Sequence, residues 1–210
     1  MRDHDIPDRT RDSHRLPGET ADIGLAVGLG AARDHPAIRA VGALSEVGAW
    51  EVLFAGSAAI WAAGAVRGDS RMAAAGRHML GAGLLASVVK TTLKRLVHRT
   101  RPNVLMETGL YARGWLGPND GPWQSFPSGH AAVSVAVARA VARTRPRARH
   151  IAHAAAGGVV AAQVLRGAHY PADVIAGALI GLAAEAAVNR LVGAVPQAAG
   201  PDVASTPIGV

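Results

Sequence analysis

Three groups of polar residues carry side chains suited to phosphate chemistry, and each stands at the edge of an apolar run. The first is Lys94 with Arg101, which supply two positive charges. The second is the stretch "PSGH" at 127–130, in which a hydroxyl, a glycine and an imidazole precede an alanine-rich segment. The third is His169 with Asp173. Because cations and the backbone donors at a helix start bind phosphate oxygens, the three groups together predict a site for a phosphate group.

Each group also has a purely structural interpretation. Lys94 and Arg101 would be solvated charges beside a membrane, and Ser128 would be the N-cap of a helix that begins at Gly129. Asp173 would only complement the dipole of the helix in which it stands. The coincidence of all three groups in this order and spacing favours chemistry over structure.

Composition narrows the classes of protein. The chain has 210 residues, half of them hydrophobic, which suits one compact domain. It contains no cysteine, so disulfide frameworks, thiolate zinc sites and cysteine nucleophiles are excluded. A formal charge of +7 and a pI near 11.1 are typical of nucleic-acid binding. However, Lys and Arg gather mainly at 67–71, 90–101 and 143–149, between apolar runs. Loops that join buried or membrane-spanning helices have this layout, and we expect no nucleic-acid partner.

Four or five longer apolar stretches predict the architecture. Several approach the roughly twenty residues that cross a bilayer, although charged residues interrupt them, so a soluble helical bundle is the alternative. Residues 20–46 are only moderately apolar and predict one or two short amphipathic or interfacial helices. We therefore expect an all-α, membrane-embedded bundle of about five to six helices. The stretches cover roughly 47–66, 72–93, 129–142, 150–166 and 172–192.

Two further patterns favour the membrane. Small residues recur at helical spacing, which suits close helix packing where no hydrophobic effect drives helices together. The pairs are Gly81 with Ala86, Gly157 with Ala161, and Gly177 with Gly181. Tryptophans stand near the ends of the predicted spans or in the connecting loop, where amphipathic rings favour the interface. They are Trp50, Trp61, Trp115 and Trp123.

The order of the spans predicts which loops share a side. The long connection 101–127, in which Gly and Pro clusters stop any helix, lies on the same side as the turn at 166–173. The arginine-rich loops at 67–71 and 143–149 lie on the opposite side. The positive-inside rule places the arginine-rich side in the cytoplasm and the long connection at the outer or periplasmic face.

The ends of the chain differ from this central part. Residues 1–18 carry charges of both signs and no hydrophobic h-region, and so predict a disordered polar tail rather than a signal peptide. We expect a helical domain over 19–193 and a flexible tail over 194–210.

The three polar groups resemble the motifs of the type 2 phosphatidic acid phosphatase superfamily, which includes bacterial lipid phosphatases and vanadium haloperoxidases. Its first motif is a lysine, six residues and Arg-Pro, matched here by Lys94, "RLVHRT", Arg101 and Pro102. Its second motif is Pro-Ser-Gly-His, matched at 127–130 without change. Its third motif is Ser-Arg, five residues, His, three residues and Asp, for which "AQVLRGAHYPAD" supplies His169 and Asp173.

This resemblance implies a mechanism. His169 would attack phosphorus to form a phosphohistidine, while Asp173 would accept a hydrogen bond from its other ring nitrogen. His130 would protonate the departing oxygen and later activate water. No metal or other cofactor is then required. The groups that would hold the phosphoryl oxygens are Lys94, Arg101, the Ser128 hydroxyl and the Gly129 amide.

The resemblance also implies a substrate and an environment. We expect a lipid phosphate or diphosphate, such as phosphatidic acid or a polyprenyl phosphate derivative. The protein would be integral to a bacterial inner or plasma membrane, with its active site facing the periplasm or exterior. The sequence leaves open the head group, the chain length and the oligomeric state.

The third motif departs from the family at its front. Gln163 stands where the family has arginine, and Ala162 takes the serine position. Glutamine keeps hydrogen-bonding capacity but lacks the charge and the bidentate fork of arginine. We hypothesise that Arg166, in the same turn as His169, partly substitutes. Two alternatives to the phosphatase stay open: a catalytically weakened member that binds a phosphorylated lipid or a partner protein, and a haloperoxidase in which His169 coordinates vanadate.

Overall fold

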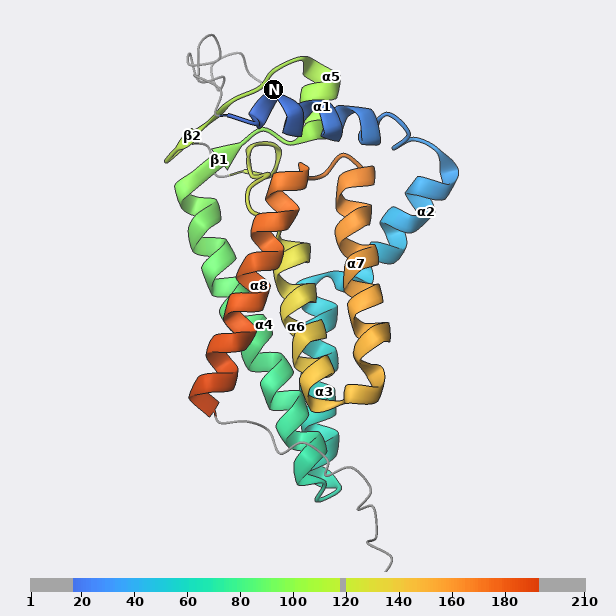
Figure 1. Ribbon diagram of the computed structural model, residues 1–210, viewed down its shortest axis with the longest axis vertical. Coiled ribbons are helices and arrows are strands. Elements are labelled where there is room, and N and C mark those ends of the chain that lie inside the picture. Colours follow the sequence, from blue (N-terminus) through green and yellow to red (C-terminus); the bar gives the residue numbers. More distant parts are fainter. Residues whose placement is uncertain (1–16, 118–119, 193–210) are drawn as a thin grey trace, which may run out of the picture.

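The computed structural model describes residues 17–117 and 120–192, most of which are helical. Five long helices form a bundle in which each helix corresponds to one predicted apolar stretch (Figure 1). The all-α fold class is therefore confirmed. The five helices are α3 (Trp50–Val66), α4 (Ser70–Leu96), α6 (Gly129–Thr144), α7 (Arg149–Leu165) and α8 (Pro171–Val192).

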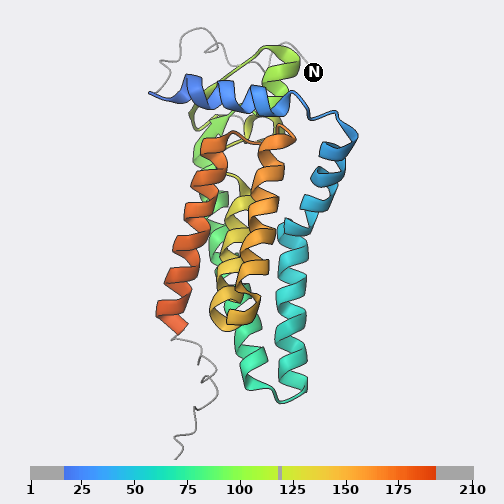
Figure 2. The same ribbon diagram turned by 45° about the vertical axis from the view of Figure 1, so that its right-hand side comes forward.

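Shorter elements cover one end of this bundle. Helix α1 (Glu19–Gly30) lies across that end, which we call the α1 end, and α2 (Pro36–Leu44) packs against α7 (Figures 1 and 2). Two short helices therefore form over residues 20–46, where one or two were predicted. The remaining short elements are the 3-10 helices η2 (Ser45–Gly48), η3 (Gly121–Trp123) and η4 (Pro146–Ala148), helix α5 (Pro102–Thr108), and the antiparallel strands β1 (Val97–Arg99) and β2 (Arg113–Trp115).

The described residues contain eight α-helices, more than the five to six expected. Part of the difference lies in the long connection, where the prediction that no helix forms is wrong. Pro102 takes the first position of α5, for which its fixed φ is suited. Gly109 ends the helix in a left-handed conformation with φ 72°. Gly and Pro therefore delimit a short helix here and do not exclude one.

Small residues let α8 lie directly against α6. A Cβ added at Gly177 would lie 2.4 Å from the Ser128 carbonyl oxygen, and one added at Gly181 would lie 2.4 Å from the Ala132 oxygen. Close packing at this predicted pair is confirmed. The corresponding prediction for Gly157 is wrong, because an added Cβ there would meet nothing within 4 Å. The backbone contact of α6 with α8 also fixes the start of each helix relative to the other.

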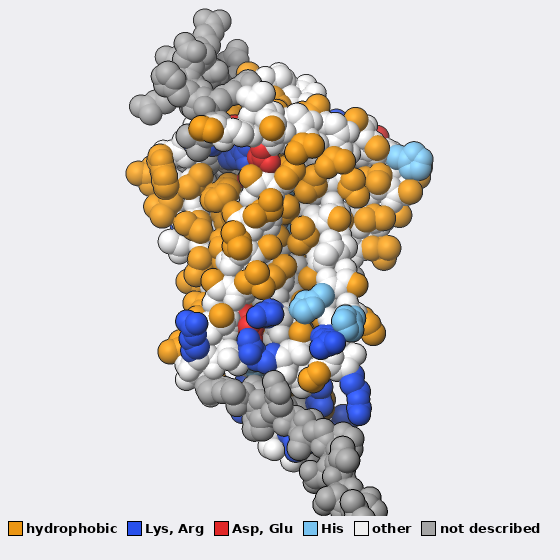
Figure 3. All heavy atoms as spheres, in the orientation of Figure 1, with side chains coloured by type: hydrophobic (Ala, Val, Ile, Leu, Met, Phe, Trp, Pro, Cys, Tyr) orange, Lys and Arg blue, Asp and Glu red, His pale blue; other side chains and the backbone are white. Residues whose placement is uncertain are grey.

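The surface of the bundle is compatible with a membrane. By length and composition alone, α4 and α8 are long and apolar enough to cross one, while α3 is a shorter apolar helix. Apolar side chains cover much of the face seen in Figure 3, and Lys and Arg gather at the end away from α1. The arginine-rich turns α3–α4 and α6–α7 lie at that far end, opposite the long connection, as predicted (Figure 1).

Two sequence predictions are met only in part. Among the four tryptophans, Trp123 is buried at 5% exposure, while Trp50, Trp61 and Trp115 are between 43% and 75% exposed. Trp123, in η3, is therefore buried and does not present its ring at the surface. The predicted tails at 1–18 and 194–210 fall almost entirely outside the described residues, so their boundaries stay predictions.

Candidate active site

The α1 end of the bundle brings the three predicted groups together. Lys94 lies in the last turn of α4, Arg101 stands at the N-cap of α5, and Ser128 is the N-cap of α6. His169 closes the turn between α7 and α8, and Asp173 lies in the first turn of α8. The positive charges of Lys94 and Arg101 both act on His169. Motifs that are far apart in the sequence therefore share one site.

His169 is held in a single tautomer. Its ring is 3% exposed, and Nδ1 donates a hydrogen bond to the Ser125 carbonyl oxygen at 2.6 Å. Because a carbonyl oxygen can only accept, the proton must sit on Nδ1, which leaves the lone pair on Nε2. Burial lowers the pKa of His169 to about 4, so the ring is neutral at pH 7. Nε2 is therefore equipped to act as a nucleophile.

Asp173 supports His169 differently from the way the family resemblance implied. Its Oδ2 lies 3.9 Å from His169 Nδ1, beyond hydrogen-bonding distance, since the Ser125 carbonyl takes the ring proton. The carboxylate is fully buried and accepts from Arg99 Nη1 at 2.8 Å, from the Ser125 hydroxyl at 2.5 Å and from the Tyr170 N–H at 2.9 Å. Asp173 therefore acts on the ring through its charge and through the position of Ser125.

The phosphate-binding candidates line the other side of this site. Lys94 Nζ donates to the Gln124 carbonyl at 2.7 Å, next to the residue that holds His169. Ser128 Oγ accepts the Ala131 N–H at 3.4 Å, so its own proton stays available to a ligand. Arg101 is half-buried, and its Nε is buried without a hydrogen-bond partner among the described residues. Unused donors at this point suit an anionic ligand.

The start of α6 has room and an additional cation. The three atoms nearest to a Cβ added at Gly129 all belong to the side chain of Lys90, at 3.7 Å. The small residue therefore leaves the backbone open to an approaching ligand. Lys90 stands one helical turn before Lys94 on α4 and lies beside Gly129. The sequence placed Lys90 in the basic run 90–101 but did not identify it as a phosphate ligand, although its i, i+4 spacing from Lys94 places both on one face.

His130, Glu46 and Arg166 form a partly exposed cluster at the edge of the site. Glu46 Oε2 lies 3.5 Å from His130 Nε2, and Glu46 Oε1 accepts from Arg166 Nη1 at 2.5 Å. The Arg166 charge also acts on His130 and on Arg101. Arg166 is thus placed near the predicted phosphate ligands, but a carboxylate pairs with it. No sequence motif includes Glu46, which comes from η2.

The side chain of Gln163 is buried and hydrogen-bonded within the protein. It is fully buried, and its Nε2 donates to Ser45 Oγ at 3.2 Å, while Oε1 is buried without a partner in the described part of the chain. Its main-chain oxygen accepts the N–H groups of Ala168 and His169 at 3.0 and 3.1 Å. The backbone at 163 therefore shapes the turn that carries His169, whichever side chain stands there.

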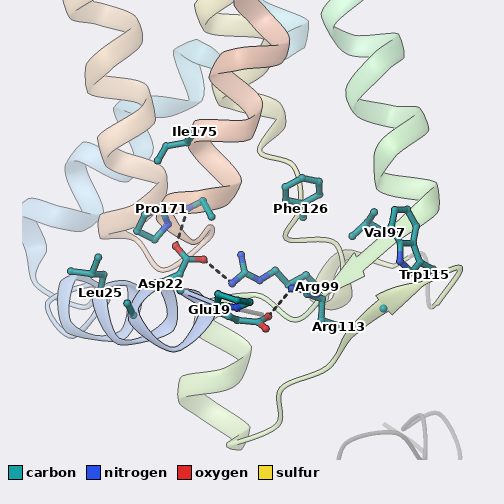
Figure 4. Close-up of a pocket in the computed structure, with 15 residues that line it drawn as sticks. Glu19, Asp22, Leu25, Val97, Arg99, Arg113, Trp115, Phe126, Pro171 and Ile175 are labelled. Atoms are coloured by element: carbon teal, nitrogen blue, oxygen red, sulfur yellow. Dashed lines mark hydrogen bonds and ion pairs between the residues drawn. The ribbon is translucent and has the colours of Figure 1, made fainter. Parts of the chain in front are cut away.

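A cavity of about 810 Å³ is lined by Arg99 and by Pro171 and Ala172 at the start of α8. Figure 4 shows it between α1, the β1–β2 strands and the start of α8, with Leu25, Phe126 and Ile175 among its apolar walls. None of the seven predicted site residues lines it. Within residues 17–117 and 120–192, His, Asp and Glu side chains form no group of three or more that could hold a metal ion.

Comparison with known proteins points to one family. The model of the PAP2 superfamily matches residues 75–196, which include all seven predicted site residues. Over 101 residues, the chain is 39% identical to the lipid A 1-phosphatases of Rhizobium johnstonii and Rhizobium etli. This match covers 47% of the chain but only 38% and 40% of those two proteins. No solved structure matches the chain.

Proposed function

This chain belongs to the PAP2 superfamily, whose model matches residues 75–196, and on that basis we propose that it hydrolyses a lipid phosphate or diphosphate ester through a phosphohistidine, without a metal. The observation that carries this proposal is the state of His169. Its Nδ1 proton is committed to the Ser125 carbonyl, its Nε2 lone pair is free, and two cations act on it. A neutral imidazole beside cations is suited to attack a phosphate group.

In the first step, the Nε2 lone pair of His169 attacks phosphorus as the bond to the leaving oxygen breaks. His130 donates a proton to that oxygen, so that the lipid leaves as an alcohol or as a monophosphate. Phosphorylated His169 carries a positive charge, which the buried Asp173 carboxylate stabilises at 3.9 Å from Nδ1. Lys94, Arg101 and the start of α6 stabilise the negative charge that spreads over the phosphoryl oxygens.

In the second step, water attacks the phosphohistidine. His130, now neutral, accepts a proton from the water, the Nε2–P bond breaks, and inorganic phosphate leaves. His169 returns to its neutral form with Nδ1–H still bonded to the Ser125 carbonyl. The same two histidines therefore serve both steps, and the chain ends each cycle in its starting state.

The surroundings support a lipid as the substrate. On α2, Val41 is 41% exposed and Leu44 is 71% exposed, and both precede Glu46 at the edge of the site. Exposed apolar side chains beside a phosphate site suit a hydrocarbon chain. We propose phosphatidic acid, a polyprenyl phosphate derivative or the 1-phosphate of lipid A as the substrate, the last because of the names of the two similar proteins. The chain would sit in a bacterial inner membrane with this site at the periplasmic face.

A weakened, lipid-binding protein is the second candidate, because Gln163 replaces the motif arginine and Arg166 already pairs with Glu46. In that case the site would hold a phosphorylated lipid without turning it over.

Phosphate release distinguishes the two candidates. Purified, detergent-solubilised protein is assayed in EDTA with phosphatidic acid, polyprenyl mono- and diphosphate, and lipid A. The test variant is His169→Ala. The matched control is His150→Ala, which removes an exposed histidine in the first turn of α7, at the end of the bundle away from α1. We expect release by the wild type and the control but none by His169→Ala. Equal release by wild type and His169→Ala would contradict the mechanism. No release by wild type, with recovery in Gln163→Arg, would favour the binding protein.

A further inference from the structure

The Arg99 side chain contacts four other residues, although Arg99 is not a defined position of any of the three motifs. Its side chain is 6% exposed and lies inside the first motif, between Lys94 and Arg101. Its Nη1 donates to Asp173, its Nη2 to Asp22 Oδ2 at 2.7 Å, and its Nε to the Tyr111 hydroxyl at 3.1 Å. Its guanidinium also lies 3.8 Å over the Tyr170 ring. These contacts fix both the position and the plane of the group.

Asp22 makes two contacts with this part of the site. Besides accepting from Arg99 through Oδ2, it accepts the Ala172 N–H through Oδ1 at 2.9 Å. Ala172 precedes Asp173 in the first turn of α8. Figure 4 shows Asp22 reaching from α1 to both partners. Asp22 therefore connects helix α1 to Arg99 and to the backbone next to Asp173.

We propose that Asp22 is a positioning residue of the active site, acting through Arg99 on Asp173 and thereby on His169. This inference rests on the proposed function. It extends the machinery beyond the family segment, because α1 ends at Gly30 and the matched residues begin at 75.

Charge balance gives the physical reason. Arg99 stands between two carboxylates, and Asp22 neutralises part of its charge. When His169 becomes phosphorylated, the ring needs the negative field of Asp173. Without the Asp22 charge, Arg99 would oppose that field more strongly and would lose one of the contacts that set its plane. Formation of the phosphohistidine would then slow.

Asp22 bonds to Arg99 and to the Ala172 N–H and is not one of the phosphate-binding candidates. It lines a cavity together with Arg99, and none of the phosphate-binding candidates lines that cavity. Loss of Asp22 should therefore change the chemical step and leave substrate binding nearly unchanged. This split distinguishes a positioning role from direct binding.

Asp22→Asn tests the inference, because the amide oxygen can still accept from Ala172 while the charge opposite Arg99 is lost. The matched control is Asp34→Asn, which removes the same charge from a side chain that is 89% exposed and lies 3.9 Å from Arg33. Full-length protein is assayed for kcat and KM on the lipid phosphate that the wild type turns over best. Only monodisperse protein from size-exclusion chromatography is used. We expect kcat to fall about ten- to a hundredfold in Asp22→Asn, with KM within about twofold and the control unchanged.

Asp22→Glu provides a second variant, since it keeps the charge on a longer side chain. Its kcat should lie between those of wild type and Asp22→Asn. A double-mutant cycle with Arg99→Lys should show that the two substitutions are not additive, because both act on one contact. The inference is wrong if kcat is unchanged in Asp22→Asn while His169→Ala is inactive, or if the Asn and Glu variants lose kcat equally. Turnover that does not depend on His169 would instead overturn the proposed function.

Discussion

The two sides of the active site differ in how completely their polar atoms are paired. On the nucleophile side, Asp173 accepts three hydrogen bonds and His169 Nδ1 donates one, all of them buried. On the phosphate side, Arg101 Nε and His130 Nε2 are buried without a hydrogen-bond partner among the described residues. Lys94 Nζ on this side already donates to the Gln124 carbonyl, so the phosphate side keeps part of its donor capacity for a ligand, whereas the nucleophile side is assembled before substrate arrives.

Energetics support this division of roles. A buried donor without a partner costs about 1–3 kcal/mol, and more if it is charged. A phosphate group that satisfied Arg101 and His130 would recover that cost on binding. The nucleophile side gains nothing comparable from a ligand, since its groups are already paired. Preorganised groups lower the barrier because they need not rearrange during the reaction.

Asp173→Asn should have the largest effect, because it removes the carboxylate that accepts three hydrogen bonds on the nucleophile side. The substitution removes the only anion that faces Arg99 from α8 and leaves a buried cation partly uncompensated. We expect kcat to fall about a hundred- to a thousandfold and the free energy of unfolding to fall by about 3–5 kcal/mol. Steady-state kinetics and chemical denaturation measure the two effects, with Asp34→Asn as the control. Normal stability with normal kcat would show that this side is not preassembled.

Arg101→Ala should separate activity from stability. It removes a half-buried cation that has an unpaired Nε, so the fold loses little, while the phosphoryl oxygens lose a ligand. We expect kcat/KM to fall about a hundredfold or more and the melting temperature to stay the same or rise. Thermal unfolding and steady-state kinetics give both values. A melting temperature that falls as far as in Asp173→Asn would contradict the comparison between the two sides.

Gln163→Arg should strengthen the phosphate side. A guanidinium at this position would add a charge-assisted contact, which contributes about 1.5–3 kcal/mol and corresponds to roughly ten- to a hundredfold in turnover. The variant should lose some stability, because the Gln163 bond to Ser45 is lost. Gln163→Lys is the control, since it adds the charge without the fork of arginine. If Gln163→Arg lowers kcat, an arginine at position 163 does not act as a phosphate ligand in this protein.

Glu46→Gln should have a smaller effect. It releases Arg166 from an ion pair whose carboxylate is 52% exposed, and exposed pairs contribute at most about 1 kcal/mol. If Arg166 compensates for Gln163, the freed guanidinium should lower KM by up to about fivefold. The control is Glu107→Gln, whose carboxylate is 59% exposed and lies 3.6 Å from Arg33. An unchanged or higher KM would remove Arg166 from the set of phosphate ligands.

The protonation of His169 should barely change between pH 7 and pH 5. Burial holds its pKa at about 4, below the ordinary value of 6.5, so the neutral ring persists to low pH. In the unfolded chain the ring binds a proton below about pH 6.5. The stability that His169 contributes is thus fully present above pH 6.5 and is lost as pH falls toward 4. ¹⁵N NMR of the ring nitrogens, assigned with His169→Ala, measures the titration, and a midpoint near 6.5 would show that the ring is not buried.

The sequence predicted those parts of the site that depend on spacing along the chain. Each long apolar run became a helix, and the motif residues met at one end because the order of the spans requires it. Spacing also suffices for Gly177 and Gly181, which pack on α6. It did not suffice for Gly157, since small residues at helical spacing do not reveal which face of α7 has a neighbour.

The residues of the candidate site that the sequence did not predict come from elements distant in the chain from their partners. Glu46 and Asp22 come from η2 and α1, and only the tertiary arrangement brings them to His130 and Arg99. Arg99 lies within a motif, but its role depends on the strand β1 that turns its side chain toward Asp173. The preference of the His169 ring for the Ser125 carbonyl depends on distances of about an ångström, which residue types alone do not set.

The nitrogen of His169 that carries the phosphoryl group tests the mechanism most directly. Protein is mixed rapidly with its lipid phosphate, quenched in alkali and digested, and the phosphohistidine isomer in the peptide is identified by ³¹P NMR and mass spectrometry. Because Nδ1–H is bonded to the Ser125 carbonyl at 2.6 Å, we predict phosphorylation of Nε2 on His169 and none in His169→Ala. Phosphorylation of Nδ1, or of another residue, would contradict the assignment of His169 Nε2 as the nucleophile.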